Sequence, residues 1–162
     1  MSPAEKLLRE LIALPSVNPA FMPPHDRRAG EQRVADFLTV VAAEGRLDVE
    51  RREVWPGRFN VLARLLPAKS KQRVVLAPHM DTIGDALMPD SMFVPKRKGD
   101  RLFGRGACDT KGSIAAMLGA VAYGVPCASK PPGSLPHESD DQHDVEHDTE
   151  LGLRELQDAQ HE

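Results

Sequence analysis

Apolar positions in the first part of the chain repeat at helical spacing on two occasions. Ser2, Pro3 and Glu5 combine an N-cap, a proline suited to the first turn and a capping box, so they predict the start of a helix. The apolar stripe that follows consists of Leu7, Leu8, Leu11 and Ile12. Pro15 is expected to end this helix, because proline cannot continue the hydrogen-bond ladder.

A second helix is predicted over residues 30–44, after a polar, proline-rich loop. Its apolar face consists of Val34, Phe37, Leu38 and Val41. Gly45 follows directly and is the residue type preferred at a helix C-terminal cap. Both helices are amphipathic, so we expect each to cover a core with one face.

The apolar period then changes from helical spacing to strand spacing. The predicted strands are residues 47–54, 59–66 and 73–77. The first two are separated by the turn Trp55-Pro56-Gly57, and the last two by a loop over residues 67–71. The third predicted strand is a continuous apolar run, which is typical of a strand buried on both faces.

A hairpin and a third helix complete the periodic part of the sequence. The hairpin is expected to pair residues 93–97 with residues 101–103 across Lys98-Gly99-Asp100. Residues 111–125 are small and apolar and predict a buried helix. Helices, strands and then a strand–loop–helix unit favour an α/β fold, in which helices cover a mixed sheet.

The pattern stops after Val125, which predicts a domain boundary between residues 1–125 and 126–162. The first part carries 19 Lys and Arg against 14 Asp and Glu, and the second carries 2 against 10. The net charges are therefore +5 and −8. The second part is acidic, rich in histidine and proline, and has no apolar period, so we expect it to be disordered.

Composition excludes several classes of function. Only 4% of the residues are aromatic, which argues against nucleic-acid binding through base stacking, and no apolar run approaches the length of a membrane span. Two cysteines do not make a disulfide framework, and the charged first ten residues do not form a signal peptide. A cytoplasmic location is the expectation that follows.

The stretch APHMDTIG, residues 77–84, ends the third predicted strand with polar side chains. His79 and Asp81 are two residues apart, so in a strand they point to the same face. Such a pair at the mouth of a sheet is either a metal site or an ordinary hydrogen-bonded polar pair. These few residues leave both readings open.

A second informative stretch, RLFGRGACDTKGSIAAML, covers residues 101–118. Gly104 and Gly106 indicate a loop between a strand and a helix, although Gly-Arg-Gly is also typical of a plain turn. Asp109 precedes the helix, where a carboxylate serves as an N-cap or binds a metal. Arg105 is expected to brace the loop or to be a surface charge, and Cys108 is expected to be a small buried residue.

The candidate site therefore consists of His79, Asp81 and Asp109. An imidazole and a carboxylate are zinc ligands by type. Asp81 is placed to accept the second ring N–H of His79, which would fix the tautomer of the ligand.

APHMDTIG followed by GRGACDTKG resembles the zinc-dependent aminoacylase and carboxypeptidase family that includes acetylornithine deacetylase and succinyl-diaminopimelate desuccinylase. The stretches LIALPSVNP, PGRFNVLARL and KGDRLFGRG are similar to further segments of that family. The resemblance covers residues 3–125. It implies the zinc-exopeptidase type of α/β fold, truncated in this sequence.

The resemblance implies a co-catalytic zinc pair, with cobalt or manganese as alternatives. His79 would bind one metal, Asp109 would bridge both, and Asp81 would orient His79 as a catalytic residue. The implied substrates are N-acyl amino acids or small peptides, cleaved at an amide bond. A homodimer is implied for an intact family member only, and neither nucleic acid nor a membrane is an expected partner.

The family also uses a Glu-Glu pair, which supplies the general base and a metal ligand. This sequence contains no two adjacent glutamates. We therefore expect an inactive N-terminal fragment. Truncation or a frameshift is the expected origin, in which residues 126–162 are translated from out-of-frame codons. The alternatives are a natural disordered tail and a non-catalytic remnant that acts as a metal-binding or regulatory fragment. Four histidines of this part, His137, His143, His147 and His161, could bind metals loosely.

Overall fold

A computed structural model of the 162-residue chain describes residues 1–66 and 72–123. The chain divides into two units, Met1–Pro126 and Cys127–Glu162, and all described residues lie in the first. The predicted loop over residues 67–71 and the predicted disorder of residues 126–162 lie outside the described residues and stay predictions. No helix in the described part is long and apolar enough to cross a membrane.

Helix α1 spans Pro3–Ala13, as its start signal predicted. The Ser2 side chain accepts a hydrogen bond of 3.1 Å from the backbone N–H of Glu5, which satisfies one of the free donors of the first turn. Leu7, Leu11 and Ile12 are buried along one face. The helix ends at Ala13, with Leu14 as its C-cap in an extended conformation.

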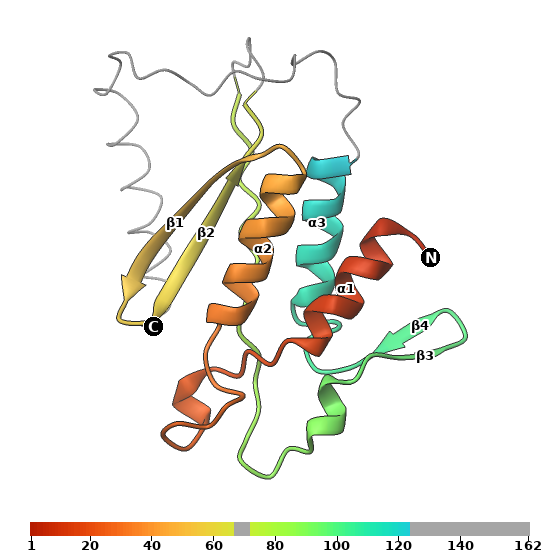
Figure 1. The fold of residues 1–162 in the computed structure, drawn as a ribbon. Helices are drawn as coiled ribbons and strands as arrows, with labels where there is room; N and C mark the ends of the chain where they lie inside the picture. Colours follow the sequence, from red (N-terminus) through yellow and green to blue (C-terminus); the bar gives the residue numbers. More distant parts are fainter. Residues whose placement is uncertain (67–71, 124–162) are drawn as a thin grey trace. The chain divides into compact units, whose positions relative to one another are not determined.

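Helix α2 spans Gln32–Glu44 and packs beside α1 and α3 (Figure 1). Gly45 is its C-cap, as predicted, but the left-handed backbone conformation falls on Arg46, whose φ is +60°. A Cβ atom on Gly45 would lie 2.6 Å from Cβ of Ala122 in α3, Lys111–Tyr123. The glycine is therefore required by the close approach of two helices and not by the turn itself.

Strands β1, Asp48–Trp55, and β2, Arg58–Arg64, form the first predicted hairpin. They pair antiparallel, with Asp48 opposite Arg64, and the register shifts between Glu53 and Trp55. Both strands contact α2. The two-residue turn between them contains Gly57, whose φ of +74° suits a glycine.

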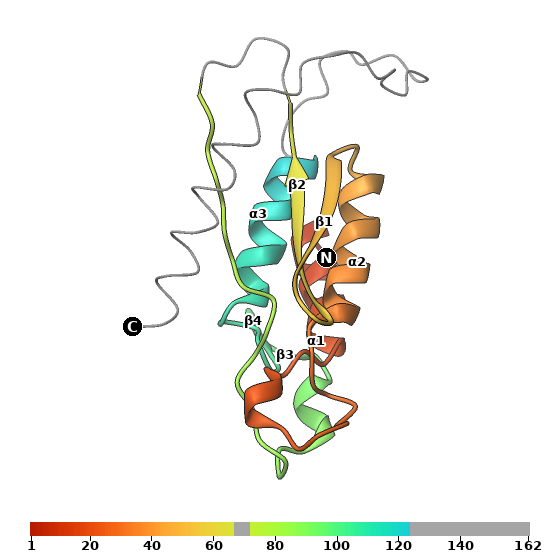
Figure 2. The ribbon, with the colours of Figure 1, turned by 90° about the vertical axis from the view of Figure 1, so that its left-hand side faces the viewer.

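The third predicted strand, residues 73–77, is not a strand, and this expectation was wrong. The segment is extended but pairs with none of the described residues, and in Figure 2 it runs alongside α3 without joining a sheet. Val74 and Val75 are 85% and 81% exposed. The burial expected from the apolar run is therefore contradicted as well, because a strand exists only when a neighbour satisfies its N–H and C=O groups.

The second hairpin forms as predicted, although its first strand is shorter and begins later than predicted. Strand β3 is Lys96–Lys98 and β4 is Arg101–Phe103, joined through Gly99-Asp100. The preceding residues form short 3-10 helix η2, Asp90–Phe93, and not a strand. A further 3-10 helix, η1, spans Pro19–Phe21.

The main core joins the three long helices. Its buried members are Leu7, Leu11, Val34, Leu38, Ile114 and Ala115. They come from α1, α2 and α3 in equal shares, so each apolar face predicted from the sequence meets the other two. The sheets within the described residues are two separate antiparallel pairs. The helix-and-sheet composition agrees with an α/β fold, whereas a single mixed sheet is not formed among these residues.

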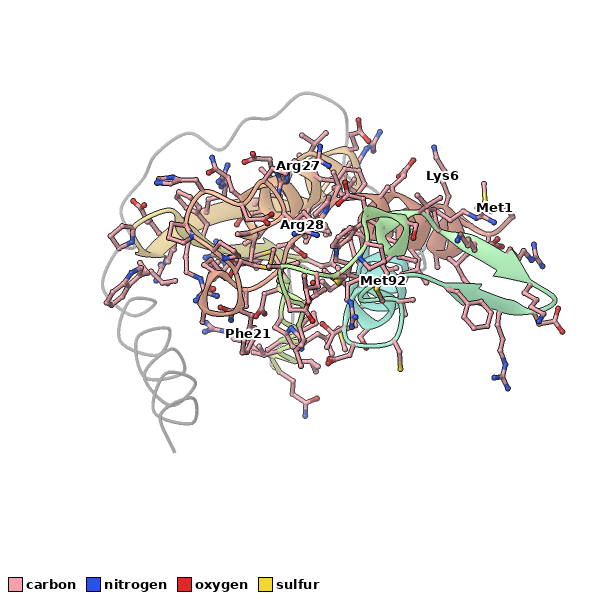
Figure 3. The ribbon with its side chains drawn as sticks, turned by 90° about the horizontal axis from the view of Figure 1, so that it is seen from below. Met1, Lys6, Phe21, Arg27, Arg28 and Met92 are labelled. Carbon is pink, nitrogen blue, oxygen red and sulfur yellow. The ribbon has the colours of Figure 1, made fainter. Side chains whose placement is uncertain are left out.

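Arg28 fastens the proline-rich loop to the segment before η2. Its guanidinium donates to both carboxylate oxygens of Asp26 and to the backbone carbonyls of Ala86 and Met88. Figure 3 shows Arg28 from below, with Arg27 and Phe21 on the same loop. The loop is thus held against a segment 60 residues further along the chain.

Candidate functional site

The three predicted site residues come together at the end of the extended segment 72–81. Nε2 of His79 lies 3.0 Å from Oδ1 of Asp109, although the two residues are 30 positions apart. Nδ1 of His79 lies 3.1 Å from Oδ1 of Asp81. One imidazole therefore stands between two carboxylates, one on each ring nitrogen.

The two carboxylates differ in their surroundings. The side chain of Asp109 is 68% exposed and that of His79 is 47% exposed, whereas that of Asp81 is 24% exposed. Asp81 lies behind the imidazole and Asp109 in front of it, toward solvent. Nδ1 of His79 also lies 3.1 Å from the backbone carbonyl of Asp81, so both acceptors on that side come from one residue.

The glycine loop places Asp109 two residues before α3. Gly106, with φ of +81°, is buried, and its carbonyl accepts a hydrogen bond of 2.9 Å from the backbone N–H of Lys111. The Thr110 hydroxyl donates a hydrogen bond of 2.6 Å to the carbonyl of His79. The peptide bond between Asp109 and Thr110 is cis. Two contacts therefore join the loop to the extended segment, one from the Thr110 hydroxyl to the backbone carbonyl of His79 and one between the side chains of Asp109 and His79.

Ser16 and Asn18 are site-supporting residues that the sequence reasoning missed. The Ser16 hydroxyl donates to the carbonyl of Met80, and the Asn18 amide donates to Oδ2 of Asp81, both at 2.8 Å. The backbone of this loop also bridges to Thr82. The signal was present in the sequence as Asn-Pro after a helix, but it indicates only a cap, not a partner 63 residues away.

Lys111 is a second residue whose place the sequence did not predict. Its side chain is fully buried, and Nζ donates to the carbonyls of Leu11, at 3.0 Å, and Leu14, at 2.6 Å. Burial, and to a smaller extent the positive charge of Arg33, lowers the pKa of Lys111 to about 8. A positive charge at the N-terminus of α3 interacts unfavourably with the dipole of that helix. Here, however, the ammonium group donates hydrogen bonds to free carbonyls at the end of α1.

The two neighbouring expectations had opposite outcomes. Arg105 braces the loop, because its backbone N–H donates to the carbonyl of Met92 at 2.7 Å and its guanidinium contacts the Met92 sulfur. Cys108 was expected to be buried, but it is an exposed free cysteine. It lies in the loop between the two buried residues Gly106 and Lys111, on the side that faces solvent.

The donor set fits a metal only in part. His79 and Asp109 present an imidazole nitrogen and a carboxylate oxygen to the same point, which are zinc ligands by type. Asp81 is turned toward the other ring nitrogen. Accordingly, the described residues contain no group of three or more His, Cys, Asp or Glu side chains arranged to hold a metal ion.

Comparison with known proteins shows that the three candidate site residues lie within a stretch that matches a protein family. Residues 75–135 match Peptidase family M20/M25/M40, so the match begins just before His79 and ends ten residues beyond Val125. The resemblance that the motifs predicted is therefore confirmed, and it reaches slightly further along the chain than the motifs indicated.

Individual relatives agree with this match. A protein of Emericella nidulans described as a probable carboxypeptidase is 30% identical over 122 residues, which are 74% of this chain and 26% of the relative. A succinyl-diaminopimelate desuccinylase of Gluconacetobacter diazotrophicus is 33% identical over 126 residues, 75% of this chain and 30% of the relative. A peptidase M20 domain-containing protein of Schizosaccharomyces pombe is 36% identical over 95 residues, 56% of this chain and 22% of the relative. The chain thus spans less than a third of the length of these relatives.

Proposed function

We propose, from the similarity of its N-terminal part to Peptidase family M20/M25/M40, that this chain carries the first part of the metal centre of an amide hydrolase. The contact of 3.0 Å between Nε2 of His79 and Oδ1 of Asp109 is the observation that carries the proposal. Residues far apart in the sequence converge there with ligand atoms that suit zinc, cobalt or manganese.

In this proposal His79 would help to hold one metal ion, and Asp109 would contribute to holding both ions. When bound, the zinc pair would polarise the scissile carbonyl and lower the pKa of the attacking water. Asp81 accepts a hydrogen bond from the N–H of Nδ1, and the lone pair of Nε2 therefore stays free for the metal. The substrates are N-acyl amino acids or small peptides, as the names of the relatives suggest.

The fold that we propose for such a hydrolase is the helix-covered mixed sheet of the zinc exopeptidases. The extended segment 72–81 would be one of its strands, because its exposed valines suit a sheet with partners on both sides. A cytoplasmic location is part of the proposal and rests on a sequence with only two cysteines.

Zinc titration of the full chain tests the metal site directly. Calorimetry should find one specific site in the wild type that is lost in the variant His79→Ala/Asp109→Ala. The double variant is the necessary control, because His137, His143, His147 and His161 could bind zinc elsewhere. Equal zinc stoichiometry and affinity in the two chains would contradict the proposal.

Hydrolysis of N-acetyl and N-succinyl amino acids and of dipeptides, with zinc added, tests the activity of the chain itself. We expect no turnover, because the sequence contains no Glu-Glu pair to act as general base and ligand. Turnover that disappears in Asp109→Ala would show that another residue supplies the base. Zinc binding without turnover is the outcome that we expect, and it would leave the alternative function standing, a non-catalytic metal-binding or regulatory fragment.

A further inference from the structure

We infer that Asn18 is a positioning residue of the metal site, acting on His79 through Asp81. This inference rests on the proposed function and extends it to a residue outside the candidate ligands. The amide Nδ2 of Asn18 donates a hydrogen bond of 2.8 Å to Oδ2 of Asp81, whose other oxygen, Oδ1, faces Nδ1 of His79. The three side chains form a continuous row from the loop after α1 to the imidazole.

The orientation of the Asn18 amide follows from its two partners. Its oxygen, Oδ1, lies 3.0 Å from the backbone N–H of Ala20, which can only donate. Its nitrogen faces a carboxylate oxygen, which can only accept when ionised. A flipped amide would place a donor against a donor and an acceptor against an acceptor. The side chain therefore has one orientation that satisfies both contacts.

The backbone of Asn18 is hydrogen-bonded to the end of the extended segment whose Asp81 its side chain supports. Its N–H donates to the carbonyl of Thr82 at 2.9 Å, and the N–H of Thr82 donates to the carbonyl of Ser16 at 2.8 Å. Ser16 also holds Met80 through its hydroxyl group. These contacts lie on both sides of Asp81, so Asn18 and Asp81 have little freedom to separate.

Asn18 determines which oxygen of Asp81 is available. With Oδ2 engaged by Asn18, the carboxylate cannot rotate freely, and Oδ1 stays on Nδ1 of His79. The proton of a neutral imidazole is then favoured on Nδ1. The lone pair is left on Nε2, the ring nitrogen that faces the other candidate ligand, Asp109. Without Asn18 the Asp81 carboxylate can turn, and Asp109 competes for the imidazole proton through Nε2.

Two substitutions separate this role from the cap that Asn18 provides to η1. Asn18→Asp and Asn18→Ser both keep an oxygen able to accept from the N–H of Ala20, because aspartate and serine are good N-caps. Aspartate replaces the amide donor with a second carboxylate oxygen, and serine removes the amide donor and shortens the side chain without adding charge. Asn60→Asp makes the same chemical change in strand β2 and serves as the matched control.

The measurement is the tautomer of His79, read from the ¹⁵N shifts of both ring nitrogens at alkaline pH in the metal-free full chain. We expect the Nδ1–H form to dominate in the wild type and in Asn60→Asp. In Asn18→Asp and Asn18→Ser the tautomer ratio should move toward Nε2–H by about three- to tenfold, the effect of one hydrogen bond. Asp81→Ala sets the upper limit of the shift.

Zinc titration separates this inference from the proposed function. A wild type that binds zinc, with an affinity about three- to tenfold lower in Asn18→Ser, supports both. A wild type that binds no zinc at His79 overturns the proposed function, while the tautomer ratio still decides the role of Asn18. An unchanged tautomer ratio in both Asn18 variants overturns the inference. So does an Asn18→Ser chain that fails to fold, because the role of Asn18 would then be structural.

Discussion

The hydroxyl group of Thr110 donates a hydrogen bond of 2.6 Å to the backbone carbonyl of His79. This contact joins the loop that carries Asp109 to the extended segment 72–81, which carries the candidate ligand His79. The 3.0 Å contact between the side chains of His79 and Asp109 is therefore supported by a second hydrogen bond, from the residue next to Asp109. The geometry of the site depends on this pair of segments staying together.

Thr110→Val should loosen that connection, because valine has nearly the same shape but cannot donate. We expect a loss of about 1 kcal/mol in the free energy of unfolding, measured with urea, and weaker zinc binding. Thr39→Val is the matched control, since the Thr39 hydroxyl donates to the carbonyl of Ala35 within its own helix α2. Equal losses in the two variants would contradict a role of Thr110 in the site.

Lys111 should matter for stability through both packing and hydrogen bonding. Lys111→Ala removes a fully buried side chain and should cost about 2–4 kcal/mol in the free energy of unfolding. Lys111→Met keeps most of the packing and loses the donors to Leu11 and Leu14, while it also removes a buried charge. We therefore expect a smaller loss in Lys111→Met. Unfolding curves at neutral pH decide this, and equal losses would mean that the hydrogen bonds dominate.

Gly106 of the glycine loop should be difficult to replace. A Cβ atom there would lie 2.8 Å from Cδ of Lys111 and 2.9 Å from Cγ2 of Thr82, and φ is +81°. Gly106→Ala should cost about 2–4 kcal/mol, from overpacking and the left-handed backbone together. Gly99, with φ of +58° and open space around it, is the matched control and should cost only about 1 kcal/mol. Thermal melting of the two variants measures the difference.

Acid should weaken the loop that contains Asp26. Hydrogen bonds from the Arg28 side chain, and then from its backbone N–H, lower the pKa of Asp26 from its ordinary value of 3.8 to about 2. The unfolded carboxyl therefore takes up a proton at higher pH than the folded one. Its stabilising contribution is present above pH 3.8 and is lost as the pH falls from 3.8 to about 2.

Asp26→Asn tests this expectation because it keeps an oxygen for Arg28 but cannot titrate. The urea midpoint of the wild type should fall more steeply with acid than that of the variant, within the window from pH 3.8 to about 2. Parallel curves for the two chains would show that the ion pair with Arg28 does not contribute.

The exposed apolar run before His79 should limit solubility. Val74 and Val75 are 85% and 81% exposed, and Leu76 is 50% exposed. Extended apolar segments with unpaired backbone groups invite association with other chains. Val74→Lys/Val75→Lys should therefore raise the soluble concentration, measured after centrifugation, with little change in melting temperature. A large drop in melting temperature would show that the valines are packed in solution.

Local signals in the sequence determined the helices and hairpins of this protein. The capping box at Ser2 and Glu5, the apolar faces of α1 and α2, and the turn at Gly57 each depend on residues close together in the chain. Their physics is the satisfaction of neighbouring backbone groups and the period of apolar side chains, so sequence alone was sufficient. The same holds for the choice of His79, Asp81 and Asp109 as candidates, although their roles remain proposals.

Only the tertiary structure decided what depends on partners distant in the sequence. The segment 73–77 has the composition of a strand, but no described residue offers the pairing that a strand requires. From the sequence, Asn18 is a helix cap and Lys111 is the first residue of a helix. In the structure, the Asn18 side chain donates to Asp81, and the Lys111 side chain donates to a carbonyl near the end of α1. Burial and hydrogen-bond partners over such separations are properties of packing, and no local pattern encodes which carbonyl or carboxylate a buried donor will meet.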